Sequence, residues 1–108
     1  EMETNDNKNL KEDTILLRLY ILGMTVTAQK AIANLEAICE ETFPGKYSIE
    51  VVDLKKDPEL ASKEQIFAVP TVVRKLPLPI RKVIGDLSDT EKVLVGLELS
   101  SNRHRNNI

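Results

Sequence analysis

An almost uninterrupted apolar run, residues 15–22 (ILLRLYIL), is followed at once by Gly23 and an amphipathic segment. Such a run is typical of a strand that is buried on both faces of a sheet. The next segment has the spacing of a helix that buries one stripe, with apolar residues at Ala28, Ala31, Ile32, Leu35, Ile38 and Cys39. A buried strand that passes directly into such a helix restricts the chain to an α/β fold.

The middle of the chain repeats this strand-helix pattern. Phe43-Pro44-Gly45 ends the first helix, because Pro cannot continue it and Gly accepts the turn. Residues 47–54 (YSIEVVDL) predict a second strand. Asp57 as N-cap and Pro58 at the first helical position predict a short helix to about Ile66. The resulting β-α-β-α order predicts a parallel strand pair with a right-handed crossover.

Signals conflict in the last third. Residues 71–76 and 80–85 predict a strand hairpin around two prolines. Ser88 and Glu91 have capping-box spacing and predict a helix from residue 89. In contrast, the apolar residues of 93–99 alternate as in a strand, and Gly96 would cost a helix interior about 1 kcal/mol. The segment is therefore a candidate for two competing structures, and Gly96→Ala is expected to favour the helical one.

Composition limits the class of protein. With 108 residues, 30% charged residues and a net charge of −2, the chain predicts one soluble domain over residues 14–99. The polar segments 1–13 and 100–108 predict flexible tails. No apolar run is long enough to span a bilayer, no secretory leader pattern opens the chain, and a single cysteine fits a reducing compartment. We expect a cytoplasmic protein without membrane association, cofactor or metal; His104 has no second ligand candidate nearby.

A basic group lies between residues 65 and 85, in which no acidic residue occurs. Its members are Arg74, Lys75, Arg81 and Lys82. Two interpretations stay open: a solvated face, or a docking site for an acidic protein surface. Nucleic acid fits less well, because the chain has four aromatic residues and none is interleaved with these charges.

The segment 68–72 (AVPTV), together with the strand-loop-helix opening, resembles the cis-proline turn of thioredoxin-like domains. That resemblance implies the order β-α-β-α-β-β-α and a cis bond before Pro70. Redox members carry Cys-x-x-Cys where the first helix begins, but residues 23–28 (GMTVTA) contain no cysteine. Cys39 falls late on the apolar stripe and predicts a buried, unreactive thiol. A thioredoxin-fold oxidoreductase is therefore the alternative hypothesis rather than the first.

Residues 76–88 (LPLPIRKVIGDLS) and 91–97 (EKVLVGL), in register with Pro70-Thr71, resemble the KaiB family of clock proteins over residues 14–99. The resemblance implies a non-enzymatic regulator that binds a KaiC-like ATPase ring and modulates its phosphorylation state, in a circadian clock or in stress adaptation. It also implies a KaiA-like protein or a SasA-type histidine kinase as further partners. A KaiB-like sensor domain of SasA type is a second alternative.

The family resemblance also implies roles for individual residues. Lys30, Arg74, Arg81 and Lys82 match basic positions of the family and are expected to contact partners, with Lys30 and Arg74 the first candidates for contact with KaiC. Lys75 joins them as a member of the basic group. A second, ground-state fold of order β-α-β-β-α-α-β and a homo-oligomer, dimer or tetramer, are implied as well. The positions associated with this fold switch are Pro70, Gly96 and Glu98.

Overall fold

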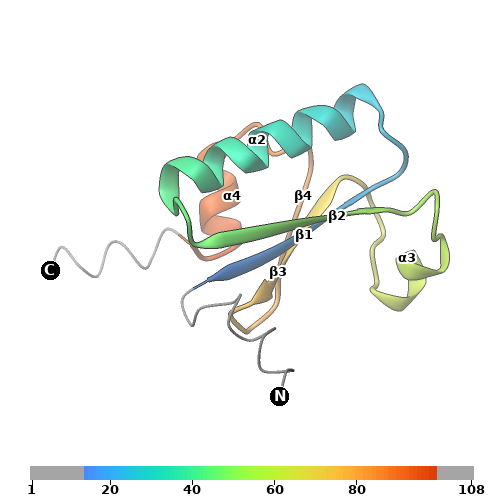
Figure 1. Ribbon diagram of the computed structural model, residues 1–108. Helices are drawn as coiled ribbons and strands as arrows, with labels where there is room; N and C mark the ends of the chain where they lie inside the picture. Colours follow the sequence, from blue (N-terminus) through green and yellow to red (C-terminus); the bar gives the residue numbers. More distant parts are fainter. Residues whose placement is uncertain (1–13, 100–108) are drawn as a thin grey trace, which may run out of the picture.

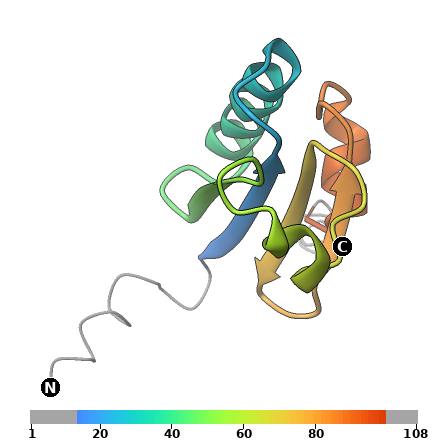
Figure 2. The ribbon, with the colours of Figure 1, turned by 90° about the vertical axis from the view of Figure 1, so that its right-hand side faces the viewer.

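The structure is a computed structural model that describes residues 14–99, in which helices cover both faces of one sheet (Figure 1; Figure 2). The elements are β1 (Ile15–Ile21), α2 (Val26–Thr42), β2 (Tyr47–Asp53), α3 (Glu59–Lys63), β3 (Thr71–Leu76), β4 (Arg81–Ile84) and α4 (Thr90–Gly96). This order confirms the predicted thioredoxin-like β-α-β-α-β-β-α succession. The predicted tails, residues 1–13 and 100–108, lie outside the described residues.

The four strands lie in the order β2-β1-β3-β4. β1 pairs in parallel with β2, which confirms the predicted parallel pair, and antiparallel with β3, which in turn pairs antiparallel with β4. The two central strands, β1 and β3, are the most buried of the four, as expected for strands covered on both sides. Because β1 is central, its C-terminal end positions the loop that leads into α2.

The two faces of the sheet are covered unequally (Figure 2). α2 and α4 pack on one face over the larger core cluster, which includes Leu17, Leu19, Leu35, Val72, Val93 and Leu97. α3 covers part of the other face over a smaller cluster, which comprises Tyr20, Leu54, Ile66 and Val73. Period-two alternation along the strands assigns neighbouring residues to opposite faces. α3 has only five residues, so the face of the sheet that it covers remains partly open to solvent.

The conflict in the last third is resolved in favour of the helix. Its N-cap is Asp89, whose carboxylate accepts the N–H of Lys92 at 3.1 Å, so the prediction of Ser88 as the cap was wrong by one residue. Val93 and Leu97 are four apart and both buried, whereas Val95 between them is 56% exposed. The apparent alternation of a strand was therefore the i, i+4 stripe of a helix interrupted by one exposed valine.

Both short helices end in a Schellman motif without glycine. At the end of α4, Leu99 N–H donates to the Leu94 carbonyl at 2.7 Å and Glu98 N–H to the Val95 carbonyl at 2.9 Å. At the end of α3, the N–H groups of Ile66 and Gln65 make the equivalent bonds at 2.8 and 3.1 Å. The residue with left-handed backbone is Glu98 after α4, with φ 58°, and Gln65 after α3, with φ 59°.

We expect Gln65→Gly to stabilise the protein, because Gly reaches positive φ without a Cβ clash. The left-handed conformation costs an L-residue about 1–2 kcal/mol, and the extra unfolded-state entropy of Gly returns about half of that. Urea denaturation should show a gain of about 0.5–1 kcal/mol in the free energy of unfolding. Glu64→Gly, one position earlier at the C-cap with φ −97°, is the control and should not stabilise. If Gln65→Gly lowers the free energy of unfolding as much as Glu64→Gly does, the prediction is wrong.

Gly96, the last residue of α4, lies directly against β4. A Cβ built there would lie 2.5 Å from Cγ2 of Val83, closer than carbon atoms approach in folded proteins. This contact argues against the expectation that Gly96→Ala favours this helical fold. The glycine permits close helix-strand approach, which sequence periodicity could not reveal.

Candidate functional site

The loop between β1 and α2 is held by backbone hydrogen bonds at the end of the sheet. Gly23, with φ 78°, donates its N–H to Oδ1 of Asp53 at 2.8 Å, and the N–H of Lys55 donates to the same oxygen at 2.9 Å. These two bonds lower the pKa of Asp53. Thr25 caps α2 by accepting the N–H of Ala28 at 3.0 Å. The start of α2 is thus well defined, and it presents no thiol.

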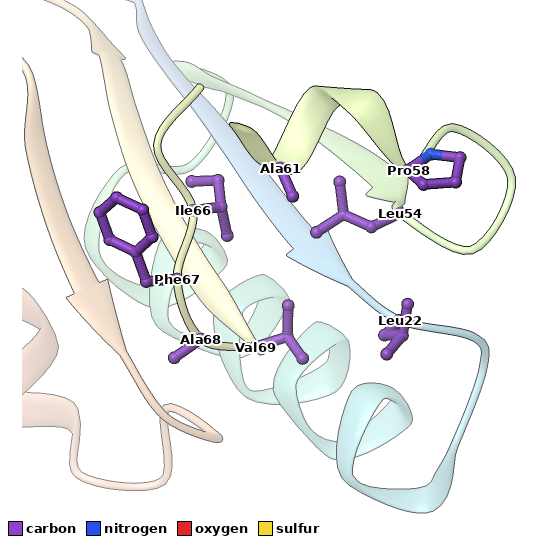
Figure 3. A pocket seen from close by; sticks show the side chains of 8 residues that line it. All are labelled: Leu22, Leu54, Pro58, Ala61, Ile66, Phe67, Ala68 and Val69. Atoms are coloured by element: carbon purple, nitrogen blue, oxygen red, sulfur yellow. The ribbon is translucent and has the colours of Figure 1, made fainter. Parts of the chain in front are cut away.

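An apolar hollow of about 240 Å³ lies beside this loop (Figure 3). Its walls come from the end of β1, the α3 region and the loop before β3, through Leu22, Leu54, Pro58, Ala61, Ile66, Phe67, Ala68 and Val69. The Schellman turn after α3 buries Ile66 in the floor and turns the next residue outward. Because no polar side chain lines the hollow, it suits an apolar side chain of a partner better than a reacting group.

Large apolar side chains around the hollow are exposed to solvent. Phe67 is 89% exposed and Leu22 is 54% exposed, and the two lie at opposite ends of the hollow (Figure 3). Met24 and Val26, next along the chain from Leu22, are also more than half exposed. Together with Val69, these residues form what we call the apolar end surface. Clustered exposure of this kind marks an interaction site rather than ordinary surface.

The predicted basic group is divided by the sheet, so it does not form one patch. Arg74 is only 4% exposed on the α4 side, and its guanidinium donates to the Leu97 carbonyl at 2.9 Å and the Pro79 carbonyl at 2.7 Å. Arg81 lies on the same side and pairs with Glu98, Nε to Oε2, at 2.9 Å. The expectation that Arg74 contributes to an exposed surface is therefore corrected: in this fold it is a buried connector.

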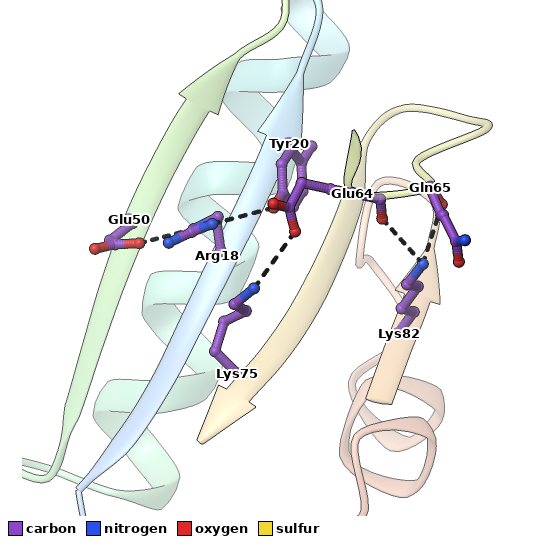
Figure 4. A network of polar contacts seen from close by, with 7 residues as sticks. All are labelled: Arg18, Tyr20, Glu50, Glu64, Gln65, Lys75 and Lys82. Carbon is purple, nitrogen blue, oxygen red and sulfur yellow. Dashed lines mark hydrogen bonds and ion pairs between the residues drawn. The ribbon is translucent and has the colours of Figure 1, made fainter. Parts of the chain in front are cut away.

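The remaining predicted positions are accessible but separate. Lys75 and Lys82 lie on the α3 side, where Lys75 pairs with Glu64 at 3.5 Å and Lys82 donates to the Gln65 carbonyl at 3.0 Å (Figure 4). Lys30 is exposed on α2, on the opposite face of the sheet. Contact of these lysines with a partner stays a prediction.

The residues assigned to the fold switch lie at three different contacts. The Val69–Pro70 bond is cis, as the thioredoxin resemblance implied, and the Pro70 carbonyl accepts the N–H of Gly85 at 2.9 Å. Gly96 abuts Val83, and Glu98 joins the end of α4 to β4 through Arg81. All three link segments of the C-terminal half to one another. A role in switching stays a prediction.

The apolar end surface contains residues that sequence reasoning did not single out. In the sequence, Phe67 is one of four aromatic residues, and Leu22 is the last residue of the apolar run 15–22. The available signal was position: Phe67 follows a helix end and precedes a proline turn, where a large apolar side chain has no element to pack against. Such a residue in a loop predicts a contact surface.

Cys39 is buried on α2, as predicted. Burial, with smaller contributions from Glu36 and Glu40, raises the pKa of its thiol to about 12. At neutral pH it is therefore protonated and a poor nucleophile. Within residues 14–99, no group of three or more metal-binding side chains occurs, and no helix is long and apolar enough to cross a membrane.

Similar folds occur among solved structures. The N-terminal domain of SasA from Synechococcus elongatus superposes with a TM-score of 0.63 at 17% identity, covering 77% of this chain and 85% of that domain. Mitochondrial thioredoxin 3 from Saccharomyces cerevisiae gives a TM-score of 0.62 at 15% identity, covering 90% and 88%. At these identities the likeness concerns the fold alone, which is thioredoxin-like.

Sequence relatives define the family. Circadian clock oscillator protein KaiB of Microcystis aeruginosa is 49% identical over 86 residues, which cover 80% of this chain and 83% of the relative. The protein of the same name from Synechococcus elongatus is 48% identical over 86 residues, covering 80% and 84%. The family model for the KaiB domain matches residues 18–99. The chain therefore belongs to the KaiB family.

Proposed function

We propose that this protein is a non-enzymatic KaiB-type regulator that binds a KaiC-like ATPase ring through its apolar end surface. Binding would modulate the phosphorylation state of the ring in a circadian clock or in stress adaptation. The observation that carries the proposal is the 89% exposure of Phe67 beside an apolar hollow in a KaiB-family domain. A large aromatic side chain next to a preformed hollow is typical of an energetic hot spot in an interface.

Two exposed lysines, Lys30 on α2 and Lys82 on β4, support an acidic partner surface. Lys30 and Lys82 are exposed and neither pairs with a carboxylate among residues 14–99. In this arrangement they would act at the rim, where complementary charge raises the association rate more than the final affinity. A KaiA-like protein, a SasA-type kinase or a second copy of the chain would then compete for, or extend, this complex.

Neither alternative function is favoured by a specific side chain. An oxidoreductase needs a thiol of low pKa near the start of α2, whereas the pKa of Cys39 is raised and its side chain is buried far along that helix. The SasA-type sensor alternative rests on a shared fold. A SasA-type sensor domain would use the same thioredoxin-like scaffold and the same kind of ring partner. It would differ in being part of a histidine kinase, not in the surface that binds the ring.

Phe67→Ser should lower affinity for a purified KaiC-like ATPase of the source organism by at least about tenfold, because truncating a hot-spot aromatic typically costs about 2 kcal/mol or more. The free energy of unfolding should stay within about 0.5 kcal/mol of the native value, since an exposed side chain contributes little to stability. Biolayer interferometry measures the first quantity and urea denaturation the second.

Val95→Ser is the matched control, because Val95 is an apolar residue that is 56% exposed on α4, away from the hollow. It should leave ring binding unchanged. Equal loss of affinity in both variants, or none in Phe67→Ser, would move the interface away from the apolar end surface.

A further inference from the structure

A second hollow lies on the α3 face of the sheet and is polar rather than apolar. Its volume is about 220 Å³, and it is lined by Tyr20, Lys63, Glu64, Gln65, Val73, Lys75, Ile80 and Lys82. Three lysines reach it from three elements: α3, β3 and β4. With one glutamate among them, the lining carries an excess of two positive charges in a chain that is acidic as a whole. We call this site the basic hollow.

The positive charges of the basic hollow are only partly neutralised (Figure 4). Lys75 pairs with Glu64 at 3.5 Å, longer than a good charge-assisted hydrogen bond. Lys82 donates to two neutral acceptors, the carbonyls of Glu64 at 3.4 Å and Gln65 at 3.0 Å. Lys63 forms no ion pair with any described residue. The nearby carboxylate of Glu50 is already engaged by Arg18 at 2.8 Å.

Lys82 is held in place before any ligand arrives. The turn that follows α3 directs two backbone carbonyls, those of Glu64 and Gln65, at the Lys82 ammonium. The turn that orients them is the Schellman motif at Gln65. A side chain that is already positioned loses less entropy when it binds an anion. Below it, the buried ring of Tyr20 and the side chain of Val73 limit the depth of the hollow.

A phosphate dianion suits this set of donors. Three ammonium groups on separate elements can approach different oxygens of a tetrahedral anion, and a charge of about −2 offsets the excess of the lining. A monocarboxylate would leave one positive charge uncompensated. Phosphate would also displace Lys75 from its long contact with Glu64 at little cost, because partly exposed pairs of this kind contribute weakly.

We propose that the basic hollow binds a phosphate group, either free or as the monoester of a small molecule. This site is distinct from the apolar end surface. It shares Lys82 with the proposed rim contacts, but phosphate binding itself does not require the ring-binding function. Inorganic phosphate and methyl phosphate, titrated into the full chain at constant ionic strength, should produce saturable shifts of the backbone amide NMR signals of Gln65, Lys75 and Lys82. Tighter binding of methyl phosphate than of phosphate would identify an ester as the ligand, and the reverse order would identify the free anion.

Variants make the test specific. Lys63→Gln and Lys82→Gln should each weaken phosphate binding about threefold to tenfold, because each removes one unit charge at contact distance. Glu64→Gln should strengthen it by a similar factor, since it removes the only competing carboxylate of the lining. Lys92→Gln on α4 is the matched control and should have no effect. Affinity for methyl phosphate should fall from pH 7 to pH 5, as the second phosphate pKa of about 6 is crossed.

Three results would overturn the proposal: shifts that stay linear in phosphate concentration, equal shifts with acetate, or a Glu64→Gln variant that binds no more tightly than the native protein. Each would indicate general screening of surface charge instead of a site. Retention of ring binding by Lys63→Gln would show that a failure here is separate from a failure of the proposed function.

Discussion

Gly96→Ala is expected to destabilise the protein, although it replaces a poor helix former with the best one. The new methyl group would lie 2.5 Å from Cγ2 of Val83, which is buried in the larger core cluster. A β-branched valine in a strand has few rotamers to escape into, so α4 must shift. Such overpacking costs about 1–3 kcal/mol and helix propensity returns less than ~1, which leaves a net loss of about 1–2 kcal/mol. Urea denaturation of the native protein and of Gly96→Ala measures this difference in the free energy of unfolding.

The double variant with Val83→Ala tests the cause. Removing the valine methyl groups makes room for the methyl group added at position 96, so Gly96→Ala should be neutral or stabilising in that background. The coupling energy of the cycle should then exceed about 1 kcal/mol in favour of the pair. If Gly96→Ala costs the same in both backgrounds, the close approach to Val83 is not the reason for the glycine. In a chain with a second fold, the single variant would shift the population away from the fold described here, which NMR peak intensities would report.

Elements with strong local signals could be predicted from sequence. β1 follows from its apolar run, α2 from its apolar stripe, and the parallel pairing of β1 with β2 from the β-α-β succession. The C-terminal helix was ambiguous because the apolar residues of 93–99 fit two periods at once. Only packing decides between the two periods: Val95 is exposed, whereas Leu97 is buried in the larger core cluster.

The candidate site could be predicted much less completely. Charge in sequence order suggested one basic patch, but period-two alternation sends Lys75 and Lys82 to one face of the sheet and Arg74 and Arg81 to the other. The apolar end surface combines the end of β1 with a loop more than forty residues later, so no local pattern contains it. The contact of Gly96 with Val83 is likewise a long-range property of the fold.

Arg74→Met should be strongly destabilising, because the buried Arg74 side chain joins two segments through hydrogen bonds from its charged guanidinium. Its two terminal nitrogens donate to the carbonyls of Pro79, in the turn between β3 and β4, and Leu97, at the end of α4. Hydrogen bonds from a charged donor contribute about 1.5–3 kcal/mol each, and methionine would leave both carbonyls without a donor. Burial is already unfavourable for this cation: it lowers the pKa of Arg74, and Nε has no hydrogen-bond partner within residues 14–99. Relief of that cost offsets part of the loss, so the expected net change is about 2–4 kcal/mol.

Arg81→Met is the control for this prediction, since Arg81 makes an exposed ion pair with Glu98 on the same side of the sheet. Exposed pairs contribute at most about 1 kcal/mol, so the two arginines should differ clearly in urea denaturation. Arg74→Lys should fall between them, because an ammonium keeps the charge but cannot span both carbonyls as the guanidinium fork does.

The difference in stability also decides how binding data on these variants are interpreted. A loss of ring affinity in an Arg74 variant would accompany a loss of folded protein, whereas a loss in a Lys30 or Lys82 variant would not. Equal stability of Arg74→Met and the native protein would mean that the two hydrogen bonds of Arg74 contribute nothing to this fold. A role of Arg74 in partner contact, as expected from the sequence, would then be the better explanation.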